Sequence, residues 1–230
     1  MIISFLNTKG GVGKTTLCVN LSRYLYLYKY RILNQDKAKN EPVEKPRILL
    51  VDADPQGSLR DWQEAGCQVD IDVIAADRRQ TLAQLSSLLN KQAYDYVLID
   101  TPGKAADITS VAITLSDLCV IPVQPSPYDL WASNDIAELI EIRQTIANGK
   151  PKAFYVLNRC IALTNIYKEA DKYLCEQHFP IIGRAITQRV IYSASAKNGQ
   201  TVFDYQNMIA QEEISALGRA LIKQGELNDI

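Results

Sequence analysis

Short apolar runs without the polar alternation of a half-exposed strand recur along the whole chain, and this pattern is typical of strands buried on both faces. The runs are Ile2 to Leu6, Ile48 to Val51, Val69 to Ile74, Tyr96 to Ile99, Leu118 to Val123 and Phe154 to Leu157. Helix-like stretches separate or follow them: Lys14 to Tyr28, Thr81 to Asn90, Asp129 to Ala147, Ile166 to His178 and Met208 to Gln224. The alternation predicts an α/β fold: a doubly wound, mostly parallel sheet with helices on both faces.

Composition narrows the possible functions. The chain has 230 residues, of which 47% are hydrophobic, enough for one substantial core, so we expect a single domain over residues 1–230. A single histidine, His178, excludes a multi-histidine metal site. We find no signal-peptide pattern and no run near the ~18 apolar residues of a membrane span, and expect a cytoplasmic protein. The five cysteines form no C-x-x-C pair, and we expect all to be reduced and buried: Cys18, Cys67, Cys119, Cys160 and Cys175.

A polar segment from Asn34 to Pro46 contains two prolines, which predicts a surface-loop insertion between the first helix and the second strand. Four tyrosines precede it at a spacing of two, which a helix cannot place on one face: Tyr24, Tyr26, Tyr28 and Tyr30. We therefore expect the first helix to end near Tyr28.

The strongest signal for chemistry lies between the first strand and the first helix. It reads Lys9-Gly10-Gly11-Val12-Gly13-Lys14-Thr15-Thr16. Glycines allow backbone N–H groups to converge on phosphate oxygens, Lys14 supplies positive charge, and the Thr15 hydroxyl can coordinate Mg²⁺. The general phosphate-loop pattern has a glycine where this chain has Thr8, and the departure brings a second lysine, Lys9, into the loop.

Carboxylates follow two of the predicted strands. Asp52 and Asp54 stand at the end of the second strand, the edge at which open α/β sheets bind ligands. Asp54 can polarise an attacking water and Asp52 can hold the water shell of Mg²⁺, or both can simply cap the next helix. Asp100 ends the fourth strand and begins a D-T-P-G turn, so it is a further candidate Mg²⁺ ligand.

These motifs resemble the ParA/MinD superfamily of deviant Walker A ATPases, in particular the small, ParF-like partition ATPases. The resemblance implies ATP and Mg²⁺ as cofactors, with Lys9, Lys14 and Asp54 as catalytic residues. It implies that Lys9 reaches across an ATP-dependent homodimer to the phosphates bound by the partner, comparable to an arginine finger supplied in trans. It also implies that Thr15, Asp52 and Asp100 serve the metal.

Later segments extend the resemblance over nearly the whole chain. Ile121 to Asp129 carries three prolines, so we expect a stiff loop that cannot be a ladder strand, near the dimer interface. Asn158 and Arg159 match the family's adenine-contacting pair, although Asn158 is also a common turn residue. Ala185 to Arg189 resembles the late region of the small partition ATPases.

Charge is unevenly distributed although the whole chain carries a net charge of -1. Residues 149–200 hold eight basic and three acidic residues, a net +5. Such a run is often only a solvated face, but the family binds DNA non-specifically through this late region. We expect Arg184, Arg189 and Lys197 to contact DNA.

Several functions compete within this superfamily. The first interpretation is an ATPase that segregates a plasmid or chromosome locus over the nucleoid. In it, a ParB-like or adaptor protein stimulates hydrolysis, which releases the ATPase dimer from DNA. The alternative is the same cycle positioning a protein organelle such as the carboxysome. A MinD-like membrane switch is disfavoured because residues 225–230 contain two acids and no base. The scattered cysteines disfavour an iron–sulfur carrier, and the intact phosphate-loop and acidic motifs disfavour an adaptor with a dead nucleotide site.

Overall fold

One parallel sheet organises the molecule. The computed structural model describes residues 1–230 except 38–40, 67–69, 90–93, 162–163 and 227–230. The strands are β1 (Ile2–Phe5), β2 (Ile48–Asp52), β3 (Ile71–Ala75), β4 (Tyr96–Asp100), β5 (Leu118–Val123) and β6 (Lys152–Leu157). They form a six-stranded sheet in the order β3-β2-β4-β1-β5-β6, and each neighbouring pair is parallel. Every predicted apolar run contributes a strand, although Val69 of the third run lies outside the described residues.

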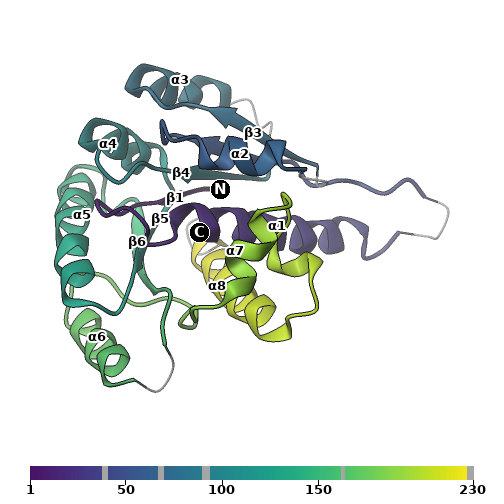
Figure 1. The fold of residues 1–230 in the computed structure, drawn as a ribbon. Coiled ribbons are helices and arrows are strands. Elements are labelled where there is room, and N and C mark those ends of the chain that lie inside the picture. Colours follow the sequence, from purple (N-terminus) through teal and green to yellow (C-terminus); the bar gives the residue numbers. More distant parts are fainter. Residues whose placement is uncertain (38–40, 67–69, 90–93, 162–163, 227–230) are drawn as a thin grey trace.

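Helices cover both faces of this sheet (Figure 1). One face carries α1 (Lys14–Asn34), α2 (Ser58–Glu64), α7 (Val190–Ala196), the 3₁₀ helix η1 (Val202–Asp204) and α8 (Met208–Glu226). The other face carries α3 (Arg79–Leu89), α4 (Ala106–Leu115), α5 (Pro127–Ile146) and α6 (Asn165–Cys175). Successive strand residues alternate between two cores, as Leu50 and Val51 do, because side chains of a strand point to opposite faces. The predicted doubly wound fold is confirmed; the short helices α2, α4 and α7 were not predicted.

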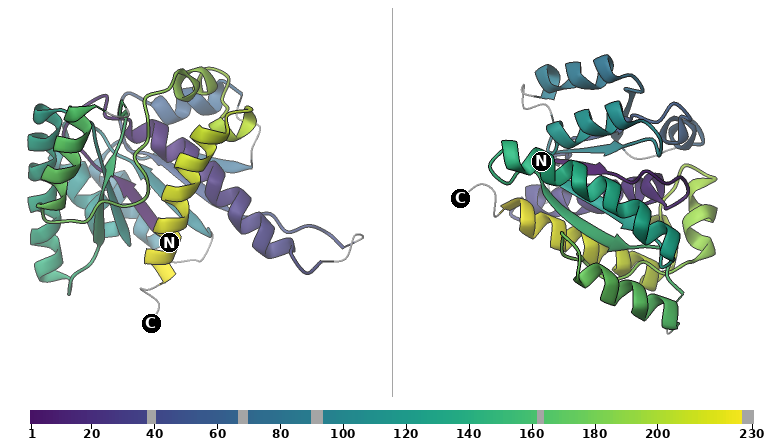
Figure 2. Two further views of the ribbon diagram at one scale, coloured as in Figure 1. Left: turned by 90° about the horizontal axis from the view of Figure 1, so that it is seen from below. Right: turned by 90° about the vertical axis from the view of Figure 1, so that its left-hand side faces the viewer.

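The first helix is longer than the sequence pattern predicts. The expected end near Tyr28 is wrong, because α1 continues to Asn34. The tyrosines pair at a spacing of four along the helix: the ring centroids of Tyr24 and Tyr28 are 6.2 Å apart, as are those of Tyr26 and Tyr30. The four tyrosines therefore do not share one face of the helix; they form two neighbouring stacked pairs. The end of α1 and the segment after it project from the body (Figure 2), and residues 38–40 of the predicted 34–46 loop lie outside the described residues.

Pro122 also departs from expectation. The prediction that Ile121 to Asp129 contains no ladder strand is wrong, since Pro122 pairs with Val156 inside β5. A residue of a strand points its N–H and C=O to the same side, and the Pro122 carbonyl accepts a hydrogen bond from the Asn7 side chain at 2.8 Å. The missing N–H therefore faces a region beyond the end of β1, where the sheet needs no ladder bond. Pro127 begins α5, a position at which its missing N–H costs nothing.

The described cysteines are all free thiols, and most of them are buried. Cys18, Cys119 and Cys160 are free and buried as expected, whereas Cys175 is exposed, which corrects the prediction for that residue. Cys67 lies outside the described residues. Among the helices that the structure describes, none has the length and apolar character needed to cross a membrane.

Candidate nucleotide-binding site

A cavity of about 790 Å³ opens at the carboxyl edge of the sheet. Its lining includes the predicted catalytic residue Asp54 and most of the predicted cofactor-binding residues: Gly10, Gly11, Gly13, Lys14, Thr15, Thr16, Asn158 and Arg159. Arg189 also lines it, whereas Lys9, Val12, Asp52, Asp100, Arg184 and Lys197 are not lining residues. The volume is in the range of small-molecule sites, and the position is the one at which parallel sheets bind ligands.

The turn from β1 into α1 requires glycine at position 13 and at a second position that packs against the turn. Gly13 has a φ of 94°, and a Cβ there would lie 2.3 Å from Asn158 Nδ2. Gly103, in the turn after β4, lies so close to this loop that a Cβ would be 3.1 Å from the Gly10 backbone nitrogen. No side chain caps the start of α1, so its first N–H groups are available to an anion.

Lys14 lies in the floor of this site and is only 7% exposed. Its ammonium group donates hydrogen bonds to the carbonyl oxygens of Asn7 and Lys9, at 3.2 and 3.1 Å. Burial lowers the pKa of Lys14, while the negative charges of Asp100 and Asp54 act in the opposite direction. A buried ammonium held only by carbonyl oxygens is suited to an anionic ligand.

Asp100 and Thr15 form the part of the site that fits a divalent cation. The Thr15 hydroxyl donates to Asp100 Oδ2 at 2.5 Å, and the buried Asp100 Oδ1 has no hydrogen-bond partner in the part of the chain that the structure describes. Burial raises the pKa of Asp100 to about 7, against the opposing effects of the Thr15 hydrogen bond and the Lys14 charge. Mg²⁺ is usually held by one or two protein oxygens together with phosphates and water, so an unpaired carboxylate oxygen beside a threonine hydroxyl matches its needs.

The two carboxylates after β2 differ in their surroundings. Asp52 is fully buried: Oδ1 accepts from the Asp54 N–H at 3.2 Å, and Oδ2 accepts from the Arg60 N–H at 3.2 Å and from its guanidinium at 3.3 Å. Its acceptors are thus already engaged, in contrast to Asp100. Asp54 lines the cavity and accepts a hydrogen bond from the Gln56 N–H at 2.9 Å.

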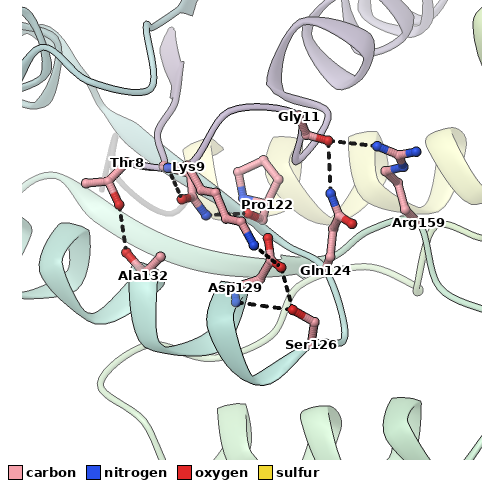
Figure 3. A network of polar contacts seen from close by, with 10 residues as sticks. Thr8, Lys9, Gly11, Pro122, Gln124, Ser126, Asp129, Ala132 and Arg159 are labelled. Atoms are coloured by element: carbon pink, nitrogen blue, oxygen red, sulfur yellow. Dashed lines mark hydrogen bonds and ion pairs between the residues drawn. The ribbon is translucent and has the colours of Figure 1, made fainter.

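Lys9 reaches Asp129 of α5 (Figure 3), and it is not among the residues that line the cavity. Its ammonium group lies 2.7 Å from Asp129 Oδ2, and the Asp129 side chain is 4% exposed against 41% for Lys9. Ser126, which caps α5, also donates to Asp129 Oδ2 at 2.5 Å. Asp129 Oδ1 is buried and finds no hydrogen-bond partner among the described residues. This ion pair was not predicted, because its two residues are far apart in the sequence.

Three side chains hold the phosphate loop from the other side. Asn158 donates to the Val12 carbonyl at 2.7 Å, while Arg159 and Gln124 both donate to the Gly11 carbonyl at 2.9 Å (Figure 3). Asn158 and Arg159 therefore lie at the cavity as predicted, and their observed hydrogen bonds fasten the loop. Gln124 was part of the proline-rich segment, but no role was predicted for it.

The predicted DNA residues fall in two classes. Arg184 and Lys197 are exposed. Arg189 instead lies 3.5 Å from the carboxylate of Glu213, a residue of α8 that is 6% exposed and that sequence reasoning missed. A buried carboxylate on a helix carries no local sequence signal when its partners come from another segment.

The parallel sheet, the glycine loop entering α1 and the lysine and aspartate at the strand ends define a phosphate-loop nucleotide-binding protein. The family described as "CobQ/CobB/MinD/ParA nucleotide binding domain" matches residues 3–45, and an "AAA domain" family matches residues 67–152. The maintenance of carboxysome distribution protein A of Halothiobacillus neapolitanus is 31% identical over 87% of this chain and 86% of its own. The sporulation initiation inhibitor protein Soj of Bacillus subtilis is 27% identical over 89% and 90%. The chain belongs to the ParA/MinD family of nucleotide-binding ATPases.

Solved structures have the same fold. The pNOB8 ParA bound to nonspecific DNA superposes with a TM-score of 0.64, at 18% identity, over 100% of this chain and 99% of its own. The septum site-determining protein MinD of Pyrococcus horikoshii, complexed with Mg-ADP, gives 0.61 at 18% identity over 99% and 95%. Proteins of this fold thus include one bound to Mg-ADP and one bound to DNA.

The raised pKa of Asp100 makes a testable prediction about stability. In the unfolded chain the carboxyl ionises near 3.8, whereas in the folded protein it stays protonated until about pH 7. Rising pH between these values therefore destabilises the wild type, and the effect levels off above pH 7. Asp100→Asn removes this ionisation and can still bond to Thr15. Its free energy of unfolding relative to wild type should rise by about 4 kcal/mol across that window, since each unit of pKa shift corresponds to about 1.4 kcal/mol.

Urea unfolding at several pH values, without Mg²⁺ and nucleotide, measures the difference. Asp107→Asn, at an exposed position in the first turn of α4, is the matched control and should show no such rise. A pH-independent difference for Asp100→Asn would contradict the buried, protonatable carboxyl.

Proposed function

We propose that the chain is a Mg²⁺-dependent ATPase that hydrolyses ATP to ADP and phosphate and positions a cargo by cycling between nucleotide states. The observation that carries the proposal is the meeting of Lys14, Thr15 and Asp54 in one cavity, with Asp100 bonded to Thr15. Residues 1–230 would act as one ATPase domain, with the segment around 34–46 as a surface insertion. The family membership and the fold of Mg-ADP-bound relatives support this assignment.

Each site residue has a role that its surroundings support. The start of α1 and Lys14 bind the phosphates; Thr15 and Asp100 hold Mg²⁺, which would neutralise developing charge on the phosphates, with Asp52 placed behind them. Asp54, at the cavity wall, orients the attacking water and receives its proton. Asn158 and Arg159 fix the loop that contacts the phosphates.

Lys9 is proposed to act in trans on the phosphates bound by a second copy of the chain. In the single chain Asp129 holds Lys9, so the partner's γ-phosphate and Asp129 compete for one ammonium group. ADP lacks the γ-phosphate, so it offers Lys9 less negative charge with which to pair. The competition gives a physical reason for a homodimer that depends on ATP.

Weakening the Lys9–Asp129 pair should therefore strengthen the dimer. Asp129→Asn keeps an oxygen to accept from Ser126 but loses the charge, and the dimer dissociation constant with ATP and Mg²⁺ should fall about 2- to 10-fold. Light scattering over a protein concentration series measures it. Asp135→Asn, at an exposed position of the same helix, should leave the constant unchanged. A weaker dimer in Asp129→Asn would show that Asp129 serves the dimer itself.

Non-specific DNA is the proposed track, which would place the protein on the nucleoid. Exposed cations at Arg184 and Lys197 support it, and the solved ParA complex with nonspecific DNA has the same fold. Arg189 is the weakest of the three predicted contacts, because its guanidinium already pairs with Glu213. A dimer aligns two basic regions and so neutralises more phosphates than one chain.

ATP should thus switch DNA binding on. Fluorescence anisotropy with random-sequence duplex at two salt concentrations, with ATP or ADP, is the test. Replacing Arg184 and Lys197 together by Gln should weaken binding without harming dimerisation. The salt dependence should flatten by about one unit of slope for each phosphate that is no longer neutralised. Replacing Lys37 and Lys45 by Gln is the control. Equal affinity for DNA with ATP and with ADP would show that DNA binding is not part of the nucleotide cycle.

The cargo is proposed to be a protein organelle such as the carboxysome, moved through an adaptor that stimulates hydrolysis. The relatives named for carboxysome distribution, at 31% and 30% identity, favour this alternative over the plasmid or chromosome partition of the first interpretation. Partition remains the second candidate because Soj is also a relative. The C-terminal residues 227–230, used against a membrane switch, lie outside the described part of the chain.

Deleting the gene in its host separates the two cargoes. We expect shell-bounded bodies, followed with a fluorescent shell protein, to lose their even spacing and cluster. Plasmid loss with normal spacing would instead establish partition. If neither changes, both cargo proposals fail. Restoring the wild-type gene should rescue spacing, whereas a Lys14→Gln gene should not.

A further inference from the structure

Glu213 of α8 is a buried carboxylate whose hydrogen bonds all go to one distant segment. Oε1 accepts from the Thr187 hydroxyl at 2.6 Å, and Oε2 accepts from the Thr187 N–H at 3.3 Å and the Tyr192 hydroxyl at 2.9 Å. The Arg189 guanidinium lies 3.5 Å from Oε1. A carboxylate that is only 6% exposed needs such donors to offset the loss of water.

The three partners of Glu213 all line the nucleotide cavity, within residues 186–193, called here the wall segment. The other edge of this segment is tied to the end of β6: the Cys160 N–H donates to the Ile186 carbonyl and the Gln188 N–H donates to the Cys160 carbonyl, both at 2.9 Å. Glu213 is thus the support on the side away from β6. Ile186 and Tyr192 also pack in the hydrophobic core, so Glu213 adds polar support to a segment that core packing and backbone bonds already hold.

The wall segment lies where the nucleoside must go. Lys14, Thr15 and Asp54 mark the phosphate end of the cavity. Asn158, Arg159 and the wall segment make up a large part of the lining outside that end, so we place the ribose and base of a bound nucleotide against them. A base is selected by polar groups held in fixed positions, since a wrong base then leaves them unpaired. Fixing the wall segment is therefore a condition for base selection.

We propose that Glu213 is a positioning residue that fixes the wall segment and thereby sets nucleotide affinity and base discrimination. This inference rests on the proposed ATPase function. Burial and the neighbouring Glu213 raise the pKa of the Tyr192 hydroxyl, so Tyr192 remains a donor throughout the neutral range. Glu213 itself touches no reacting atom; it acts through Thr187, Arg189 and Tyr192.

The test compares Glu213→Gln with wild type by calorimetric titration of the full chain with Mg-ADP and Mg-GDP. The amide keeps the shape but presents N–H groups to donors, so ADP affinity should fall about tenfold and the preference for ADP over GDP should narrow. Glu212→Gln is the matched control: it is the adjacent residue of α8, exposed and paired with Arg219, and should leave both values unchanged.

Tyr192→Phe guards against a variant that fails to fold. It removes a single donor, keeps the ring in the core, and should produce a smaller change in the same direction. A merely structural Glu213 would lower the unfolding temperature while the ratio of ADP to GDP affinity stayed at the wild-type value, and that result overturns the inference. A wild type that binds ADP and GDP equally overturns it too. A wild type that binds no nucleotide refutes the proposed function instead.

Discussion

The turn from β1 into α1 constrains more of this molecule than any other feature. Its left-handed glycine at position 13 packs against Asn158, and Gly103 approaches the same loop from β4. A side chain at position 13 would displace the Asn158 amide, and one at position 103 would press on the backbone of the phosphate loop. The close approach is possible only because parallel strands end at one edge, so residues distant in the sequence meet there. The cavity is the space that this edge, α2 and the wall segment leave between them.

Buried charge is the second consequence of that geometry. Lys14 and Asp100 lie below the loop with lowered and raised pKa respectively, and in both cases burial is the largest cause. Among the described residues neither has a full set of partners: the hydrogen bonds of Lys14 go to carbonyl oxygens, and one oxygen of Asp100 accepts none. Such a site is less stable than an apolar core of the same size, and a ligand carrying phosphate and Mg²⁺ supplies the missing charges.

The sequence predicts the sheet well because each strand is an apolar run that local composition reveals. The sequence also predicts the place of the phosphate loop and of Asp100, because both lie in short motifs of consecutive residues directly after an apolar run. It fails where long-range packing decides. The tyrosine spacing suggested a break in α1 that four-residue stacking removes, and Pro122 enters a strand because its missing N–H faces the region past β1. Asp129 and Glu213 escape notice for the same reason, since their partners are fixed only by the fold.

Two ion pairs connect residues near the cavity to helices on opposite faces of the sheet. Lys9 pairs with Asp129 of α5 on one face of the sheet, whereas Arg189 pairs with Glu213 of α8 on the other. In the proposed cycle the γ-phosphate competes for Lys9 alone, while the wall segment meets the nucleoside, which ATP and ADP share. Release of Lys9 from Asp129 is therefore one route by which the difference between ATP and ADP would reach α5. In that cycle the contacts of Glu213 with the wall segment would respond to the nucleoside, which is the same in ATP and ADP.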